Sequence, residues 1–193
     1  MVPHPIRFGI SLECGDSNLE RESLIRVAAQ VGFEDVHLIE PTPSPSAPGN
    51  RSNASVIHGN AIVAATHQLM RRAVKQRTIV GIGPLCGTEE DVASHVAMAR
   101  AQLGDLMAGV ELAFSFLQVS IDDPTDLSVL HHLMPSLSET QIRRFATVLD
   151  GSIGSAASRI REFHEELGIS YFTFHKSLGT TWNTLASLVK AVK

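Results

Sequence analysis

Four side chains that can transfer protons follow segments that the sequence predicts to be strands. Glu13 follows a predicted strand at 6–12, Glu40 one at 36–39, His58 a short one at 56–57 and His175 one at 170–174. Functional sites of parallel strand–helix folds gather at the carboxyl ends of the strands, so these groups are predicted to share one face. Two carboxylates and two imidazoles there suit general acid–base catalysis.

These residues also have structural interpretations. Glu13 or Glu40 alone could cap a helix or form a salt bridge, and most of the nine histidines in a chain of this kind serve packing or the surface. A metal site made of the four groups would need ligands brought together only by the fold. No short-range ligand spacing supports it, and the sequence therefore predicts no metal.

Two segments offer backbone amides to a phosphate group. Gly59 and Asn60 directly follow His58 and precede a predicted helix, while Gly154 and Ser155 open another helix. A helix N-terminus binds anions through its unpaired amides and its dipole. An ordinary N-cap is the alternative interpretation at both places.

The elements that must position these groups alternate between strands and helices. Further strands are predicted at 78–82 and 110–121, and three predicted helices end at a glycine directly before a strand: Gly32, Gly104 and Gly168. Helix starts are predicted at Ser17, Asn60, Thr88 and Ser138, the last with a stripe of Ile142, Phe145, Ala146 and Leu149. This alternation predicts a parallel sheet with right-handed crossovers.

The length of the chain limits which parallel fold it can form. Its 193 residues suffice for one domain, predicted to span 1–193. A complete eightfold barrel takes about 250 residues. We therefore predict an α/β fold, a reduced or incomplete (β/α) barrel of about six parallel strands, with an open doubly wound sheet as the alternative.

A proline- and serine-rich segment interrupts the alternation at 41–55. Its composition excludes regular structure and predicts a long loop. Loops of this length are either functional lids or tolerated surface excursions, and both interpretations stay open.

The composition excludes several classes of protein. The net charge of −4 and the lack of a basic cluster argue against a nucleic-acid partner. No apolar run approaches the ~20 residues of a membrane span. The two cysteines lack metal-ligand spacing, so a reduced protein in the cytoplasm is predicted, with a small molecule as its partner.

Several motifs resemble the luciferase-like flavin/deazaflavin oxidoreductases. They are Arg77-Thr78-Ile79-Val80-Gly81-Ile82, His58-Gly59-Asn60, Gly104-Asp105 through Gly109-Val110-Glu111-Leu112, Gly151-Ser152, and Gly168-Ile169-Ser170-Tyr171. Together they cover roughly residues 56–193 and the opening strand–helix–strand. The family's central strands have no counterpart here, and Glu40-Pro41-Thr42-Pro43 replaces its Asp-His segment after the second strand.

The resemblance implies a luciferase-like barrel, often dimeric, that binds flavin mononucleotide (FMN) or the deazaflavin coenzyme F-420 and catalyses monooxygenation or hydride transfer on a small organic substrate. It places Gly154 and Ser155 near the cofactor.

Two other functions stay open beside this oxidoreductase. One is an acid–base enzyme without a redox cofactor, such as a cyclase, isomerase or lyase. The other is a non-catalytic binding protein on the same fold. Apolar surface left by missing strands favours self-association, so we predict a homodimer.

Overall fold

A computed structural model describes residues 4–13, 18–39, 78–82, 87–122, 127, 130–131, 134–175 and 180–193. Its strands are β1 (Arg7–Glu13), β2 (Asp35–Ile39), β3 (Thr78–Gly81), β4 (Val110–Phe116), β5 (Gln118–Ile121), β6 (Val148–Gly151) and β7 (Ile169–His175). Its helices are α1 (Asn18–Val31), α3 (Glu89–Leu103), α5 (Glu139–Ile142), α6 (Ile153–Leu167) and α7 (Trp182–Val192), with a 3-10 helix, η2 (Gly104–Gly109).

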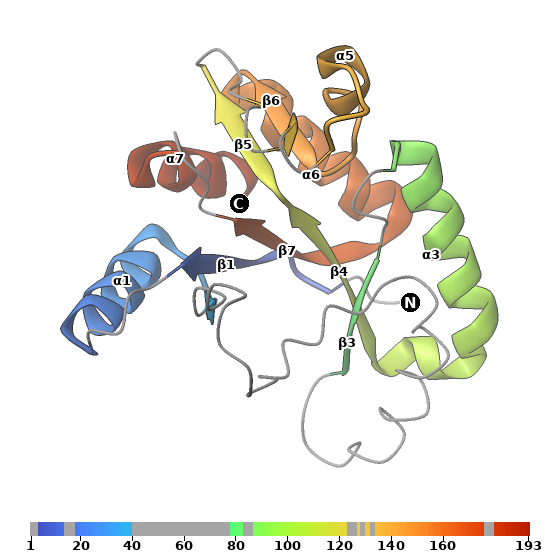
Figure 1. Cartoon of the computed structure of the whole chain (residues 1–193). Helices are drawn as coiled ribbons and strands as arrows, with labels where there is room; N and C mark the ends of the chain where they lie inside the picture. The colour runs from blue at the N-terminus through green and yellow to red at the C-terminus, as the bar shows by residue number, and fades with distance from the viewer. Residues whose placement is uncertain are drawn as a thin grey trace, which may run out of the picture.

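Five of the strands form one curled parallel sheet in the order β2-β1-β7-β4-β3. The last strand, β7, therefore lies between β4 and the first strand, as it would in a closed barrel (Figure 1). Strands β2 and β3 follow one another among the described strands but occupy opposite edges of this sheet. The described strands form a half-barrel, in which β2 and β3 are the two edge strands. A fold of parallel strands and crossover helices is confirmed.

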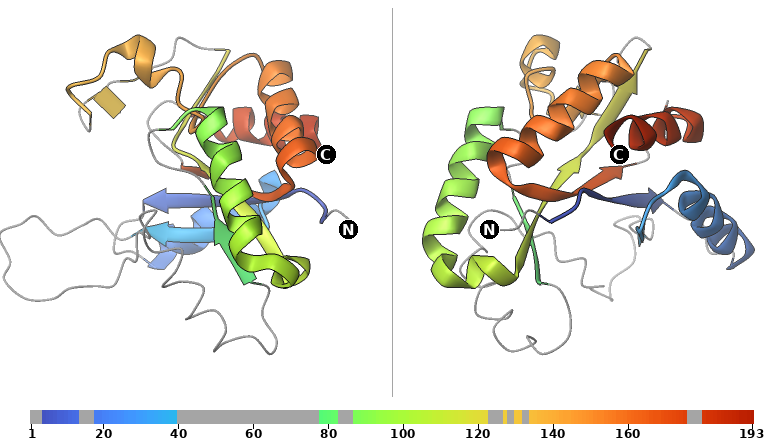
Figure 2. Two further views of the ribbon diagram at one scale, coloured as in Figure 1. Left: turned by 90° about the vertical axis from the view of Figure 1, so that its right-hand side faces the viewer. Right: turned by 180° about the vertical axis from the view of Figure 1, so that it is seen from behind.

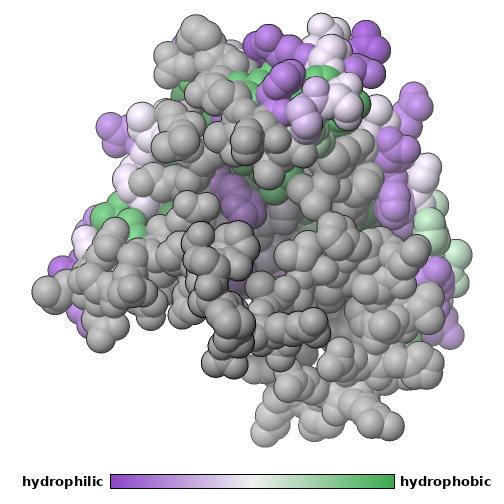
Figure 3. Space-filling model, in the orientation of Figure 1, coloured by the Kyte–Doolittle hydropathy of each residue, from purple (hydrophilic) through white to green (hydrophobic). Residues whose placement is uncertain are grey.

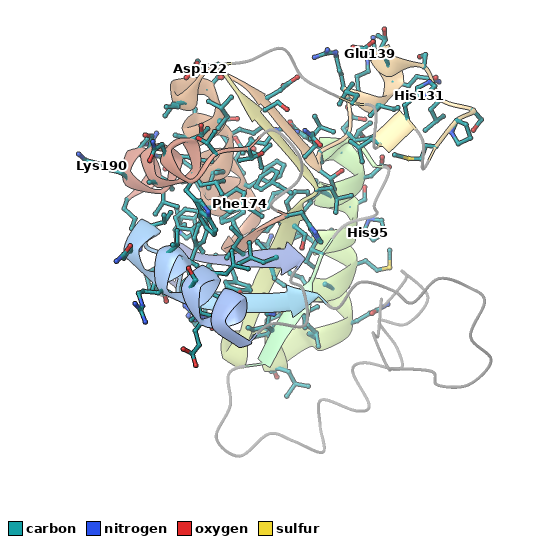
Figure 4. The ribbon with its side chains drawn as sticks, turned by 60° about the vertical axis from the view of Figure 1, so that its left-hand side comes forward. His95, Asp122, His131, Glu139, Phe174 and Lys190 are labelled. Carbon is teal, nitrogen blue, oxygen red and sulfur yellow. The ribbon has the colours of Figure 1, made fainter. Side chains whose placement is uncertain are left out.

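The helices surround the convex side of the half-barrel in the order α1, α7, α6 and α3 (Figures 1 and 2). Their apolar faces pack on alternate strand residues, among them Phe8, Phe114, Phe116, Phe172 and Phe174, all at most 1% exposed. Phe174 lies inside this layer of aromatic rings (Figure 4). Since every second residue of a strand points to this side, the core fixes which residues face the concave side.

The predicted helix boundaries are largely confirmed. Thr88 caps α3 through a capping box with Asp91, and Ser138 does so with Gln141 at α5. Gly32 and Gly168 end α1 and α6 with φ of 102° and 67°, values that a residue without Cβ adopts without strain. Gly104 ends α3, but the chain continues into η2 before β4 begins.

Two predictions of secondary structure are wrong. The segment 110–121 is not one strand: it breaks at Leu117, where the amides of Leu117 and Gln118 both donate to the carbonyl of Thr147, at 2.9 and 3.3 Å. The stripe that begins at Ile142 does not continue the helix, because 148–151 forms strand β6 and pairs with β5 in a second, two-stranded sheet.

Tertiary contacts explain the missed strand. Arg159 of α6 donates to the carbonyls of Val148 and Ala146, at 2.6 and 3.3 Å, and thereby holds this backbone extended. The predicted apolar residues are buried as expected, but Ile142 and Phe145 pack in a separate small cluster with Val148. With 148–151 counted, the described strands number seven, where about six were predicted.

Several predictions fall outside the described residues. These are the loop at 41–55, the strand at 56–57, the helix from Asn60 and the cap at Ser17.

Candidate functional site

The concave face of the half-barrel is polar. It is built by the strand residues that alternate with the aromatic core: Arg7, Gly9 and Ser11 of β1, Asp35 and His37 of β2, Glu111, Ala113 and Ser115 of β4, and Tyr171, Thr173 and His175 of β7. In the register of the sheet, Ser115 lies beside Thr173 and Thr173 beside Gly9, while His175 lies beside Ser11 and Ser11 beside His37. The concave face therefore has an amino half and a carboxyl half with different side chains.

An arginine fills the amino half. Arg7 donates to three carboxylates, with Nε–Glu34 at 2.7 Å, Nη2–Asp35 at 3.1 Å and Nη1–Glu111 at 2.8 Å. Glu111 is 2% exposed and also accepts a hydrogen bond from Ser170 Oγ at 3.3 Å. The hydrogen bond to Glu34, together with the charge of Glu111, raises the pKa of Arg7 above its usual value. This half of the face is an ionic cluster in which Glu111 is buried while Glu34 and Asp35 are partly exposed.

The phenol of Tyr171 crosses β1 above Gly9. A Cβ at Gly9 would overlap the Tyr171 hydroxyl, so only glycine leaves this path open. On the far side, Tyr171 Oη lies 3.0 Å from His37 Nε2. Burial, followed by the charge of Asp35 and a hydrogen bond to it, raises the pKa of the Tyr171 phenol well above its usual range. Tyr171 thus joins three neighbouring strands.

The carboxyl half of the concave face carries hydroxyl side chains, and one of them, that of Ser115, is exposed. Ser115 is exposed although β4 is an interior strand and its neighbours Phe114 and Phe116 are 1% and 0% exposed. Its Oγ lies 2.6 Å from Thr173 Oγ1, and Ser11 and His175 are adjacent in the next row. Figure 3 views the molecule in the same orientation as Figure 1, with the described residues coloured by hydropathy. Hydroxyls of this kind can hydrogen-bond a small polar molecule.

A second group of polar residues lies at the end of the β5–β6 ribbon. Asp122 has φ of 61° and projects at the tip of the molecule, where its amide donates to Gly151 O at 2.8 Å (Figure 4). Gly151 has φ of 95°, and its missing Cβ leaves room for Ser155 Oγ. This end of the ribbon adjoins the first turn of α6.

The structure describes only part of the predicted acid–base set. His175 ends β7, with Ser11 next to it in the register. Glu13 ends β1, but only its backbone is described. Glu40 and His58 lie outside the described residues, as do Gly59 and Asn60. The predicted convergence of the four groups stays a prediction.

The first turn of α6 is an N-cap with room for an anion. Ser152 and Ser155 cap each other: the Ser155 amide donates to Ser152 Oγ at 3.1 Å, and the Ser152 amide donates to Ser155 Oγ at 3.0 Å. A phosphate would therefore bind through the amides of Ile153 and Gly154. Gly154 is exposed, and even a Cβ there would make only one ordinary contact. The capping box thus takes the amides of Ser152 and Ser155 and leaves those of Ile153 and Gly154 for an anion such as a phosphate.

A metal fits less well. Nowhere in the described ranges do three or more His, Cys, Asp or Glu side chains gather in an arrangement that could hold a metal ion.

Sequence reasoning missed Ser11, Ser115, Thr173, His37 and Tyr171. The signal was present, because Arg7 and Ser11, with Gly9 between them, and Tyr171, Thr173 and His175 alternate with apolar residues. Alternation of this kind indicates a strand with one polar face. The two segments were interpreted only as buried strands, which concealed this face.

Comparison with known proteins adds no identity: no family model and no curated protein matches the chain. In the part of the chain that the structure covers, every helix is too short or too polar to cross a membrane.

Proposed function

We propose that the chain is a luciferase-like oxidoreductase that acts on a small organic substrate with FMN or the deazaflavin coenzyme F-420. The observation that carries this proposal is the exposed Ser115 in an interior strand of a parallel half-barrel. Side chains fill the interior of a closed barrel, and an exposed hydroxyl on the concave face in its place can contact a ligand.

The strand order supports the same proposal. Among the described strands, β2 and β3 are the edges of the half-barrel, and the segment of the chain between them is where the resemblance to the luciferase-like family lacks its central strands. The last strand, β7, pairs with the first, β1, as the last and first strands of a closed barrel do.

In this proposal the carboxyl half of the concave face and the first turn of α6 each have a role. The amides of Ile153 and Gly154 hold the phosphate, the hydroxyls of Ser115 and Thr173 orient the ligand on the concave face, and His175 holds or moves a proton. The bound flavin or deazaflavin supplies hydride or oxygen chemistry, while the protein orients the reactants and excludes water.

A second candidate function is acid–base catalysis without a redox cofactor. It is favoured by the adjacent Ser11 and His175 at the carboxyl end of the sheet, where a proton acceptor and a hydroxyl donor lie in one row.

The homodimer and the cytoplasmic location stay predictions. Light scattering on the purified chain tests whether it is a homodimer.

The test is titration of the purified chain with FMN and with F-420, followed by absorbance and fluorescence. We expect saturable micromolar binding of one of them by the wild-type chain. Ser115→Leu should abolish binding because it replaces the exposed hydroxyl with a larger apolar side chain. Ser94→Leu is the matched control, since Ser94 is an exposed serine on α3, whose outer surface faces away from the sheet. Lack of binding by the wild-type chain, or unchanged binding by Ser115→Leu, would contradict the proposal.

A further inference from the structure

Residues 134–145, which include α5 and are called the α5 segment below, belong to a small apolar cluster that is separate from the main core. The buried members of this cluster are Leu127, Leu130, Ile142, Phe145 and Val148. Figures 1 and 2 show α5 at one end of the molecule, outside the layer of helices that packs on the sheet. Within the α5 segment only Ile142 and Phe145 are buried, so few side chains attach it to the rest of the protein.

The backbone hydrogen bonds of the α5 segment are also local. Among the described residues, its amides donate to acceptors within residues 130–142. The first amide after the segment is that of Ala146, and it donates to Gly87 O at 2.8 Å. Arg159 of α6 holds the same residue, because its Nη2 donates to Ala146 O at 3.3 Å. The segment therefore ends at a residue that is fixed to the rest of the fold.

Two kinds of contact attach the α5 segment to the β5–β6 ribbon. Ile142 and Phe145 pack with Val148 of β6 in the small cluster. Arg143 Nη1 lies 3.5 Å from Asp150 Oδ2, and these side chains are 40% and 34% exposed, so this ion pair contributes little. The helix α5 is a single turn of four residues, too short to be stable without packing. A segment attached by two buried side chains can open while the rest of the protein stays folded.

The face of the ribbon on which this cluster packs also carries polar side chains. Gln118 of β5 is the register neighbour of Val148, so the two side chains lie on one face. Gln118 is 3% exposed, and its Nε2 donates to Ser120 Oγ at 3.0 Å. Ser120 and Asp150 are neighbours on the same face, closer to the carboxyl ends of the strands. An amide buried beside an apolar cluster loses hydrogen bonds to water, which makes its burial costly.

We propose that the α5 segment is a hinged cap, which opens as one unit about Ala146 while the half-barrel stays folded. Opening separates the apolar side chains of the cap from Val148 and uncovers the Gln118 amide. The open state thus presents an amide, a hydroxyl and a carboxylate on one face of the β5–β6 ribbon. The proposal is independent of the flavin and of both candidate functions, because it concerns only this ribbon and its cap.

Amide hydrogen exchange of the full-length chain, resolved by residue with NMR, tests whether the cap opens separately. We expect the amides of residues 142–145 to exchange through the open state, with little dependence on urea at low concentrations. The reason is that opening of the cap exposes little surface. The amides of β7 should exchange only on global unfolding, so their rates should rise steeply with urea. Equal urea dependence of the two groups would overturn the proposal.

Two matched substitutions distinguish the cap from the main core. Ile142 and Ile160 are both 0% exposed, but Ile160 of α6 belongs to the main core. Ile160→Ala destabilises the closed and open states alike relative to the unfolded chain. The amides of β7 should therefore exchange about thirtyfold faster or more, while the rates at 142–145 stay unchanged. Ile142→Ala destabilises the closed state alone and should accelerate both groups. Faster exchange at 142–145 in Ile160→Ala, or unchanged exchange there in Ile142→Ala, would contradict a separate cap.

A thiol readout tests whether opening uncovers Gln118. In a background with Cys14→Ser and Cys86→Ser, the thiol of Gln118→Cys should react with an aromatic disulfide reagent through the opening measured at 142–145. The matched control is Leu149→Cys, since Leu149 is 0% exposed and lies in the main core on the opposite face of β6. Its thiol should react only on global unfolding. Equal protection of the two thiols would show that the cap does not cover Gln118 and would overturn the proposal.

Discussion

The two halves of the concave face are made from the same four strands, yet they differ in how their polar groups are used. In the amino half, Arg7 binds three carboxylates and the buried Glu111 is enclosed. In the carboxyl half, Ser115 and Thr173 bond to each other and Ser115 remains exposed. The ion pairs of the amino half connect neighbouring strands, whereas the exposed hydroxyl of Ser115 in the carboxyl half can contact a ligand. This division agrees with the general rule that sites in such folds lie at the carboxyl ends of strands.

The largest effect is expected from Arg7→Ala. It leaves the Glu111 carboxylate buried without its cation, and such a change costs about 3–5 kcal/mol of unfolding free energy. Urea unfolding followed by circular dichroism measures it. The double variant Arg7→Met with Glu111→Leu should lose less than Arg7→Ala, because it removes both buried charges. An equal or greater loss in the double variant would show that the ion pair is not what stabilises the amino half.

Gly9→Ala should have the next largest effect on stability. The added methyl group overlaps the Tyr171 hydroxyl, and overpacking of this kind costs about 1–3 kcal/mol. The same substitution in a Tyr171→Ala background should cost clearly less, since the hydroxyl is gone. Thermal unfolding of the four proteins gives the coupling. Strict additivity would mean that the phenol does not cross β1 at this point.

Titration of the Tyr171 phenol tests whether its surroundings in the amino half raise its pKa. Tyr171 is the single tyrosine of the chain, so near-ultraviolet tyrosinate absorbance reports it alone. Its pKa is raised in the fold, so an unfolded chain loses this proton near pH 10 while the folded one keeps it. The stability from the neutral phenol is thus complete below about pH 10 and is lost as the pH rises toward the folded pKa. Ionisation near pH 10 in the folded protein would show that burial and the charge of Asp35 do not keep the phenol neutral.

Ser115→Ala should have the smallest effect on stability. The hydrogen bond to Thr173 is partly exposed, and losing it costs about 0.5–1.5 kcal/mol. We expect the variant to unfold almost like the wild type but to bind the ligand of the carboxyl half more weakly. A loss of stability as large as that of Arg7→Ala would remove the distinction between the two halves.

The elements whose ends are marked by local chemistry could be predicted from sequence. Thr88, Ser138 and Gly168 act where they were expected, because a cap or a left-handed glycine depends on its immediate neighbours. The strand at 148–151 could not be predicted in this way. Its backbone is held by Arg159 and by pairing with β5, contacts that a local pattern does not contain.

The candidate site was predicted only in outline. The expectation that His175 ends a strand on a functional face rested on topology, and the structure places it beside Ser11. The pairing of His37 with Tyr171 depends on two residues that are far apart in sequence and on the space above Gly9. No spacing rule within one segment contains that information.

The position of β7 between β1 and β4 has a consequence for how the protein is made. During synthesis, β1 can pair with β2 early, but its other edge has no partner until residues 169–175 leave the ribosome. The aromatic layer, which needs Phe172 and Phe174, is then also incomplete. Non-local pairings of this kind slow folding and expose strand edges meanwhile. The nascent chain should therefore depend on chaperones until its last strand arrives.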